Sequence, residues 1–112
     1  MTVVRVCGVG DVPAGEARRF DLDGCRLAVV RVATGAGTGT GDEWFAIDDR
    51  CTHAEASLAE GPVWADDCEI ECPRHGSTFD LRTGKPLTLP ATRPAVTYAV
   101  RVDGDDVMVD LP

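Results

Sequence analysis

The chain has 112 residues, with eleven Lys and Arg against nineteen Asp and Glu, and a formal net charge of −8. This length allows one small domain with one hydrophobic core. The acidic balance excludes the function classes that need a basic surface, namely nucleic-acid binding and attachment to anionic membranes. The sequence has no run of about 20 apolar residues, so it predicts no membrane span.

The N-terminal residues and the cysteines both bear on the compartment. Residues 1–5 lack the apolar run of a signal peptide, and we therefore expect a cytoplasmic protein. In that reducing compartment, five cysteines indicate metal ligands or buried thiols rather than a disulfide framework.

Short apolar runs separated by turn residues predict an all-β chain, folded as an antiparallel sandwich or barrel. A short helical piece is expected at residues 13–18. The Gly-rich segment 34–41 is expected to be a flexible hairpin connection. Strands are expected, in chain order, at residues 3–7, 26–32, 43–47, 97–102 and 107–111.

The last two expected strands form the clearest hairpin. Tyr98, Val100 and Val102 fall on one strand face, and apolar residues alternate with others through residues 107–111. The intervening Asp103-Gly104-Asp105-Asp106 is typical of a tight turn. Further turns are expected at residues 21–24 and 83–86.

Two short segments pair a cysteine with a histidine. They are Cys51-Thr52-His53 and Cys72-Pro73-Arg74-His75, and together they use both histidines of the chain. Thiolate and imidazole ligands suit tetrahedral zinc, and they also suit an iron–sulfur centre in which two His replace two Cys on one iron. Zinc fingers usually pair Cys with Cys and His with His inside each short motif, whereas each segment here contains one Cys and one His. A zinc-binding structural module remains the alternative.

The pattern Cys-x-His, a spacer and Cys-Pro-x-His-Gly resembles the Rieske [2Fe–2S] proteins, and the resemblance covers nearly the whole chain. It implies one cluster per chain, with Cys51 and Cys72 on one iron and His53 and His75 on the other. It also implies a single Rieske domain over residues 1–112, in which two loops form a small cluster-binding subdomain at about residues 48–91. With two neutral imidazoles the oxidised centre carries no net charge, which makes an electron easier to add than in an all-Cys cluster.

Neighbouring residues acquire expected roles from the same resemblance. Leu58 and Leu89 are candidates for an apolar lid, and Pro90 resembles the loop that covers the cluster. High-potential Rieske proteins carry a Ser and a Tyr that donate hydrogen bonds to the cluster. Ser77 matches the Ser, but Phe79 stands at the Tyr position and has no hydroxyl. Fewer donors stabilise the reduced state less, so we expect a low potential.

The resemblance implies a soluble ferredoxin rather than an enzyme. It would carry one electron from a flavin-dependent reductase to the terminal oxygenase of a ring-hydroxylating dioxygenase system, as a monomer that binds both partners transiently. No spare histidine is left for acid–base work. The alternatives are an accessory Rieske protein in iron–sulfur assembly and the small subunit of a nitrite-reductase-like enzyme.

The remaining notable residues are expected to be structural. Aspartate clusters at residues 48–49, 66–67 and 103–106 are expected to be solvated turns, which can steer the protein toward a basic partner. We expect core or incidental thiols at Cys7, Cys25 and Cys68, and core or edge packing at Trp44 and Trp64.

Overall fold

The computed structural model describes residues 2–22, 24–33, 42–51, 56–74, 76–89 and 91–111. These residues form antiparallel β-strands and three 3₁₀ turns, without an α-helix, so the all-β prediction is confirmed. No helix in this part of the chain is long and apolar enough to cross a membrane. The strands are β1 (Thr2–Gly8), β2 (Glu16–Leu22), β3 (Cys25–Ala33), β4 (Asp42–Asp48), β5 (Val63–Trp64), β6 (Glu69–Glu71), β7 (Thr78–Asp80), β8 (Thr97–Tyr98), β9 (Val100–Asp103) and β10 (Asp106–Leu111); the turns are η1 (Val9–Asp11), η2 (Leu58–Glu60) and η3 (Ala65–Asp67).

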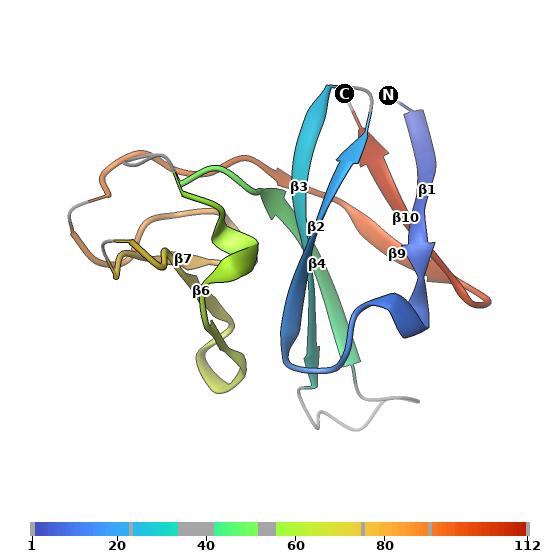
Figure 1. Ribbon diagram of the computed structural model, residues 1–112, viewed down its shortest axis with the longest axis horizontal. Helices are drawn as coiled ribbons and strands as arrows, with labels where there is room; N and C mark the ends of the chain where they lie inside the picture. The colour runs from blue at the N-terminus through green and yellow to red at the C-terminus, as the bar shows by residue number, and fades with distance from the viewer. Residues whose placement is uncertain are drawn as a thin grey trace.

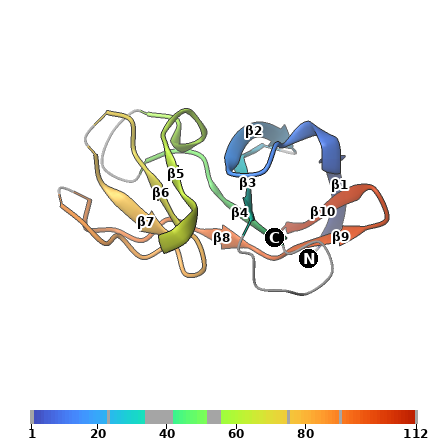
Figure 2. The ribbon, with the colours of Figure 1, turned by 90° about the horizontal axis from the view of Figure 1, so that it is seen from below.

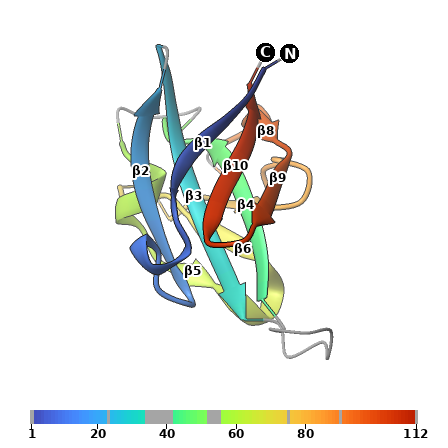
Figure 3. The ribbon, with the colours of Figure 1, turned by 90° about the vertical axis from the view of Figure 1, so that its right-hand side faces the viewer.

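Three sheets divide the molecule into a sandwich and a smaller lobe. One sheet has the strand order β1-β10-β9, and the other sandwich sheet has the order β2-β3-β4-β8. The small sheet β5-β6-β7 lies to one side of both, as Figures 1 and 2 show. Figure 3 shows β1 and β10 crossing in front of β2, β3 and β4, so the two larger sheets face each other.

Strand β3 is buried on both faces and therefore serves two cores. Leu27 and Val29 pack into the clusters that fill the sandwich, together with Val107 and Val109 of β10. The alternate residues of β3 point the other way, because successive side chains of a strand lie on opposite faces. These alternate residues, Ala28, Val30 and Val32, join a cluster that also contains buried residues of the smaller lobe.

The expected hairpin near the C-terminus is confirmed, with one difference. Asp103 pairs with Asp106, and Gly104 has φ of +63°, which suits a two-residue loop. The expected strand at residues 97–102 is divided at Ala99 between the two sandwich sheets. Its first part, β8, pairs with β4, whereas its second part, β9, pairs with β10. Strands β2 and β3 likewise form a hairpin, with Leu22 paired to Cys25.

The helical piece expected at residues 13–18 is wrong. Gly15 has φ of +81°, which a right-handed helix does not accommodate, and its N–H donates to the Arg31 carbonyl oxygen at 2.7 Å. Strand β2 begins at Glu16 and pairs along its length with β3. Hydrogen bonding to a neighbouring strand therefore overrides the local helical preference. The Gly-rich segment 34–41 lies outside the described residues, and it joins the paired strands β3 and β4.

Candidate metal centre

The first Cys/His segment leaves the end of β4. Cys51 is buried, and its N–H donates to the Ala56 carbonyl oxygen at 3.0 Å. One residue on each side, Arg50 and Ser57 form an antiparallel bridge. The two ends of this first loop, residues 50–57, are thus held together at its base. His53 lies within the loop but outside the described residues.

The second Cys/His segment connects β6 to β7. Cys72 is fully buried and is a free thiol. Its N–H donates to the Ser77 carbonyl oxygen at 2.7 Å, and its own carbonyl accepts from the Gly76 N–H at 3.0 Å. Gly76 has φ of +74°, which L-residues with a side chain rarely adopt, so a glycine suits this tight turn. This second loop spans residues 72–77, and its His75 lies outside the described residues.

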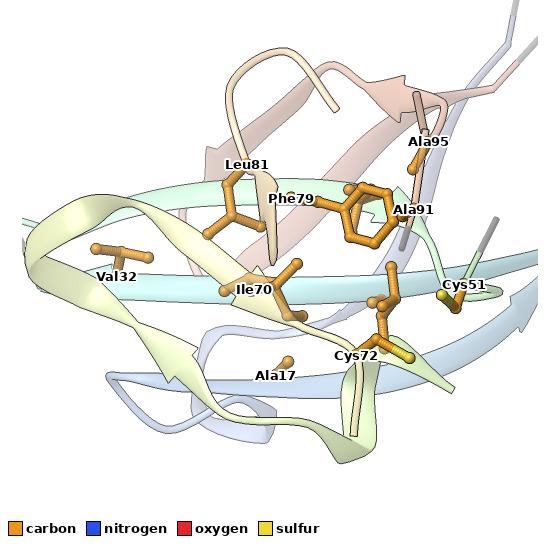
Figure 4. Packing of buried hydrophobic residues seen from close by; sticks show 13 residues of the cluster. Ala17, Val32, Cys51, Ile70, Cys72, Phe79, Leu81, Ala91 and Ala95 are labelled. Carbon is orange, nitrogen blue, oxygen red and sulfur yellow. The ribbon is translucent and has the colours of Figure 1, made fainter. Parts of the chain in front are cut away.

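The two loops bring their cysteines into one buried cluster. Cys51 and Cys72 share it with Leu58, Ile70 and Phe79. Figure 4 shows both cysteines toward the end of the cluster away from Val32. The fold therefore unites two of the four expected ligands, the two thiols, in a region that water does not reach.

A third loop, residues 81–96, packs over the same region. The Ala91 N–H donates to the buried Ser77 hydroxyl at 3.1 Å, and the Thr78 N–H donates to the Thr88 hydroxyl at 2.9 Å. Leu89 points outward and is 78% exposed, whereas the other proposed lid residue, Leu58, is fully buried beside the cysteines. Pro90 lies outside the described residues.

Comparison with known proteins identifies this arrangement. Residues 2–101 match the Rieske [2Fe–2S] domain. The chain belongs to the Rieske [2Fe–2S] family. It is 46% identical, over its full length and 96% of the relative, to the 3-phenylpropionate/cinnamic acid dioxygenase ferredoxin subunit of Shigella boydii serotype 4.

Solved structures of Rieske ferredoxins match the fold as well. The ferredoxin of carbazole 1,9a-dioxygenase from Nocardioides aromaticivorans IC177 superposes with a TM-score of 0.83 and 39% identity, covering 97% of each chain. A second match comes from a complex of reduced oxygenase and oxidized ferredoxin in carbazole 1,9a-dioxygenase. It has a TM-score of 0.79 and 38% identity, covering 96% of this chain and 91% of that one.

The described part of the site fits the Rieske cluster that the family implies. Cysteine thiolates are the sulfur ligands of such clusters, and the two thiols come from two separate loops, as Rieske ligation requires. Both are buried among apolar residues, which limits the access of water. Cys72, being free of a disulfide, can take the thiolate form that a metal needs.

Asp49, two residues before Cys51, is a buried residue that the sequence reasoning misjudged. The expected solvated turn is wrong at this position, because Asp49 is fully buried. Its carboxylate accepts hydrogen bonds from the Ser57 hydroxyl at 2.7 Å and from the Ala59 N–H at 2.8 Å, and Arg26 lies 3.3 Å away. Nothing in the sequence separates Asp49 from its half-buried neighbour Asp48, because the partners come from distant segments.

Gly61 permits two backbone segments of the smaller lobe to approach each other closely. A Cβ at this position would lie 1.8 Å from the Glu71 carbonyl oxygen and 3.0 Å from Pro73 Cδ. A side chain here would therefore push the end of η2 away from the second loop.

The other cysteines and Trp44 pack against the hydrophobic clusters, as expected, whereas Trp64 is 49% exposed. Cys7 is buried within the sandwich, Cys25 packs at the edge of the sandwich core, and Cys68 packs half-buried against the cluster that contains Cys51 and Cys72. Burial raises the pKa of the Cys7 and Cys68 thiols, which disfavours the reactive thiolate. Trp44 packs against the sandwich core, and Trp64 lies on β5, the edge strand of the small sheet.

Proposed function

We propose that this protein carries one electron at a time to the terminal oxygenase of an aromatic-ring dioxygenase system, and that a flavin-dependent reductase supplies the electron. The observation that carries the proposal is the burial of Cys51 and Cys72, from two loops, in one apolar cluster. The full-length likeness to dioxygenase ferredoxin subunits supports the choice of partner.

We assign the cluster to Cys51, His53, Cys72 and His75, and the cluster-binding part to about residues 48–91 of a single Rieske domain. The group supplies reversible one-electron chemistry when it is bound. The chain holds the two thiols in place and keeps water from them. Because all four ligands are protein side chains, no position on either iron is left for a substrate, and the protein acts as a carrier rather than as an enzyme.

We infer a low reduction potential from the residues around the second loop. The Ser77 hydroxyl accepts a hydrogen bond from Ala91, and it still has a proton to donate. Phe79 is fully buried and has no hydroxyl to add a second donor. Since fewer donors stabilise the added electron less, a redox titration should give a midpoint well below about +100 mV, toward the lower end of the Rieske range.

The protein is proposed to meet its partners transiently, as a cytoplasmic monomer. Its net charge of −8 favours fast, salt-sensitive encounter with a basic surface. The rate of reduction by a flavin-dependent reductase should therefore fall as ionic strength rises, and gel filtration should give the mass of one chain. A rate independent of salt would contradict electrostatic steering.

The decisive test is the metal content of the purified protein and of matched cysteine variants. Wild-type protein should contain about two iron atoms and two acid-labile sulfides per chain and give a paramagnetic signal on reduction. The Cys72→Ala variant should lose the iron, the acid-labile sulfide and the paramagnetic signal. The Cys68→Ala variant, changed four residues earlier in the chain, should keep them. Colourless protein with bound zinc, or a Cys72→Ala protein that keeps its cluster, would overturn the assignment.

A further inference from the structure

Asp49 joins the sandwich to the first loop through its main chain. It directly follows β4, its N–H donates to the Arg26 carbonyl oxygen at 2.9 Å, and its own carbonyl accepts from the Leu58 N–H at 2.6 Å. Arg26 belongs to β3 and Leu58 to η2. The backbone at this position thus links β3 of the sandwich to η2, the segment that follows the loop carrying Cys51.

The side chain of Asp49 makes the same connection more strongly. Its Oδ2 accepts from the Ser57 hydroxyl at 2.7 Å and lies 3.3 Å from Arg26, while Oδ1 accepts from the Ala59 N–H at 2.8 Å. Arg19 of β2 adds a cation at 4.0 Å. The carboxylate is fully buried, and hydrogen bonds to a charged group are stronger than those between neutral groups.

The carboxylate contacts one end of the first loop directly, through Ser57, and that end is bridged to the other end at Arg50. Asp49 immediately precedes Arg50, which bridges to Ser57, and Ser57 itself donates to Asp49. Residues 51–56, with Cys51 and His53, lie between these two fixed points. By contrast, the described polar contacts of Cys72 in the second loop are backbone hydrogen bonds to Ser77 and Gly76.

We propose that Asp49 is a positioning residue for the cluster: its buried carboxylate, tied to Arg26 on one side and to Ser57 and Ala59 on the other, sets the place of Cys51 at the start of the first loop. The inference rests on the proposed function, since it concerns how the chain holds the group that the function needs. Outer residues of this kind commonly tune the affinity and electronic structure of a metal site without contacting the metal.

The test compares Asp49→Ala and Ser57→Ala with Val109→Ala, which removes buried volume from the sandwich core at a distance from the loops. Asp49→Ala should shorten the half-life of the cluster under a chelator about tenfold and change the paramagnetic spectrum of the reduced protein. Ser57→Ala, which removes one hydrogen bond, should shorten it about threefold. Val109→Ala should lower the unfolding midpoint yet leave the spectrum as in wild-type protein.

A folded Asp49→Ala protein that assembles no cluster would also support the inference, and if this variant fails to fold, Ser57→Ala decides. The inference is overturned if the decisive variant has the wild-type spectrum and loses its cluster no faster than Val109→Ala does. Wild-type protein without any paramagnetic signal would instead overturn the proposed function. A normal wild-type signal with unaffected loop variants would overturn this inference alone.

Discussion

The sandwich and the smaller lobe, which contains β5, β6 and β7, are held together in different ways. Strands β1 to β4 and β10 run for six to nine residues, whereas β5, β6 and β7 run for two or three. The long strands bond through ladders of backbone hydrogen bonds, interrupted in the β1–β10 pair by a register shift between Arg5 and Cys7. The smaller lobe depends instead on particular residues, with Asp49 and Ser77 acting through hydrogen bonds of their side chains. Gly61 and Gly84 act through the absence of a side chain, because a Cβ would lie 1.8 Å from the Glu71 carbonyl oxygen at Gly61 and 1.9 Å from the Ala95 carbonyl oxygen at Gly84. Regular strand pairing therefore stabilises the sandwich, whereas the contacts of individual residues shape the smaller lobe.

Removing the cluster should have the largest effect, and it should fall on one region. In a Cys51→Ala/Cys72→Ala variant we expect amide protection to collapse in residues 69–80, because binding free energy at a metal site contributes to local folding. Protection of β3 and β10 should persist, since their ladders do not contain the cysteines. Hydrogen exchange with mass spectrometry measures both. An equal loss of protection in both regions would mean that they unfold as one unit.

Gly61→Ala should be the next most damaging change. The new Cβ would overlap the Glu71 carbonyl oxygen, so the free energy of unfolding should fall by about 2–4 kcal/mol in urea titration. Gly10→Ala in the sandwich is the matched control, because a Cβ there meets nothing within 4 Å. We expect that control to change the free energy of unfolding by less than about 1 kcal/mol. Equal effects at the two glycines would remove the contrast between the regions.

Ser77→Ala should have a moderate effect on both stability and potential. The Ala91 N–H loses its acceptor, which should cost about 1 kcal/mol of unfolding free energy. Loss of the hydroxyl donor should also lower the midpoint potential. The control is Thr83→Ala, which removes a hydroxyl from an exposed turn of the third loop. A redox titration in which both variants shift the midpoint alike would show that the Ser77 hydroxyl has no special influence.

The smallest expected effect is a pH dependence at the boundary between the two regions. Burial raises the pKa of Asp48, so the folded state binds this proton more tightly than the unfolded chain does. Its ionisation therefore costs stability as pH rises from about 4, the unfolded pKa, through the higher folded value. Asp48→Asn should gain stability relative to wild-type protein over that window and stay level above it.

Asp21→Asn gives the opposite sign and serves as the control for Asp48→Asn. A hydrogen bond from Arg19 lowers the pKa of Asp21. Ionised Asp21 therefore contributes to the free energy of unfolding above its unfolded pKa, and this contribution is lost as the pH falls through its folded pKa. The stability deficit of Asp21→Asn should therefore shrink in acid. Urea titrations between about pH 3 and 7 measure both variants. Parallel curves for the two would contradict the different environments that the structure gives them.

The fold could be predicted from the sequence where apolar and polar residues alternate along a whole strand. Strand β10 shows this, since its alternate residues are buried as expected. The division at Ala99 was not predictable, because a strand pattern does not say which neighbour the strand pairs with. The short strands β5 to β7 carry too few residues to show any period.

The residues of the candidate metal centre could be proposed from the sequence where the chemistry of metal binding restricts the residue type. Cys51 and Cys72 lie in one buried cluster, but the assignment of Cys51, His53, Cys72 and His75 as ligands stays a prediction, because both histidines lie outside the described residues. Asp49 marks the limit of such reasoning. It differs from Asp48 through contacts with segments far away in the chain, and these contacts exist only once the sheets have formed.

The pairing of Thr2 with Leu111 has a practical consequence for experiments on this protein. Both ends of the chain lie at one edge of the sandwich, away from the smaller lobe (Figure 1). A tag, a fused reductase or a tether to an electrode could be attached at either end and would start from nearly the same point. Such attachments would leave the loops facing outward, so the carrier could be immobilised and still exchange electrons.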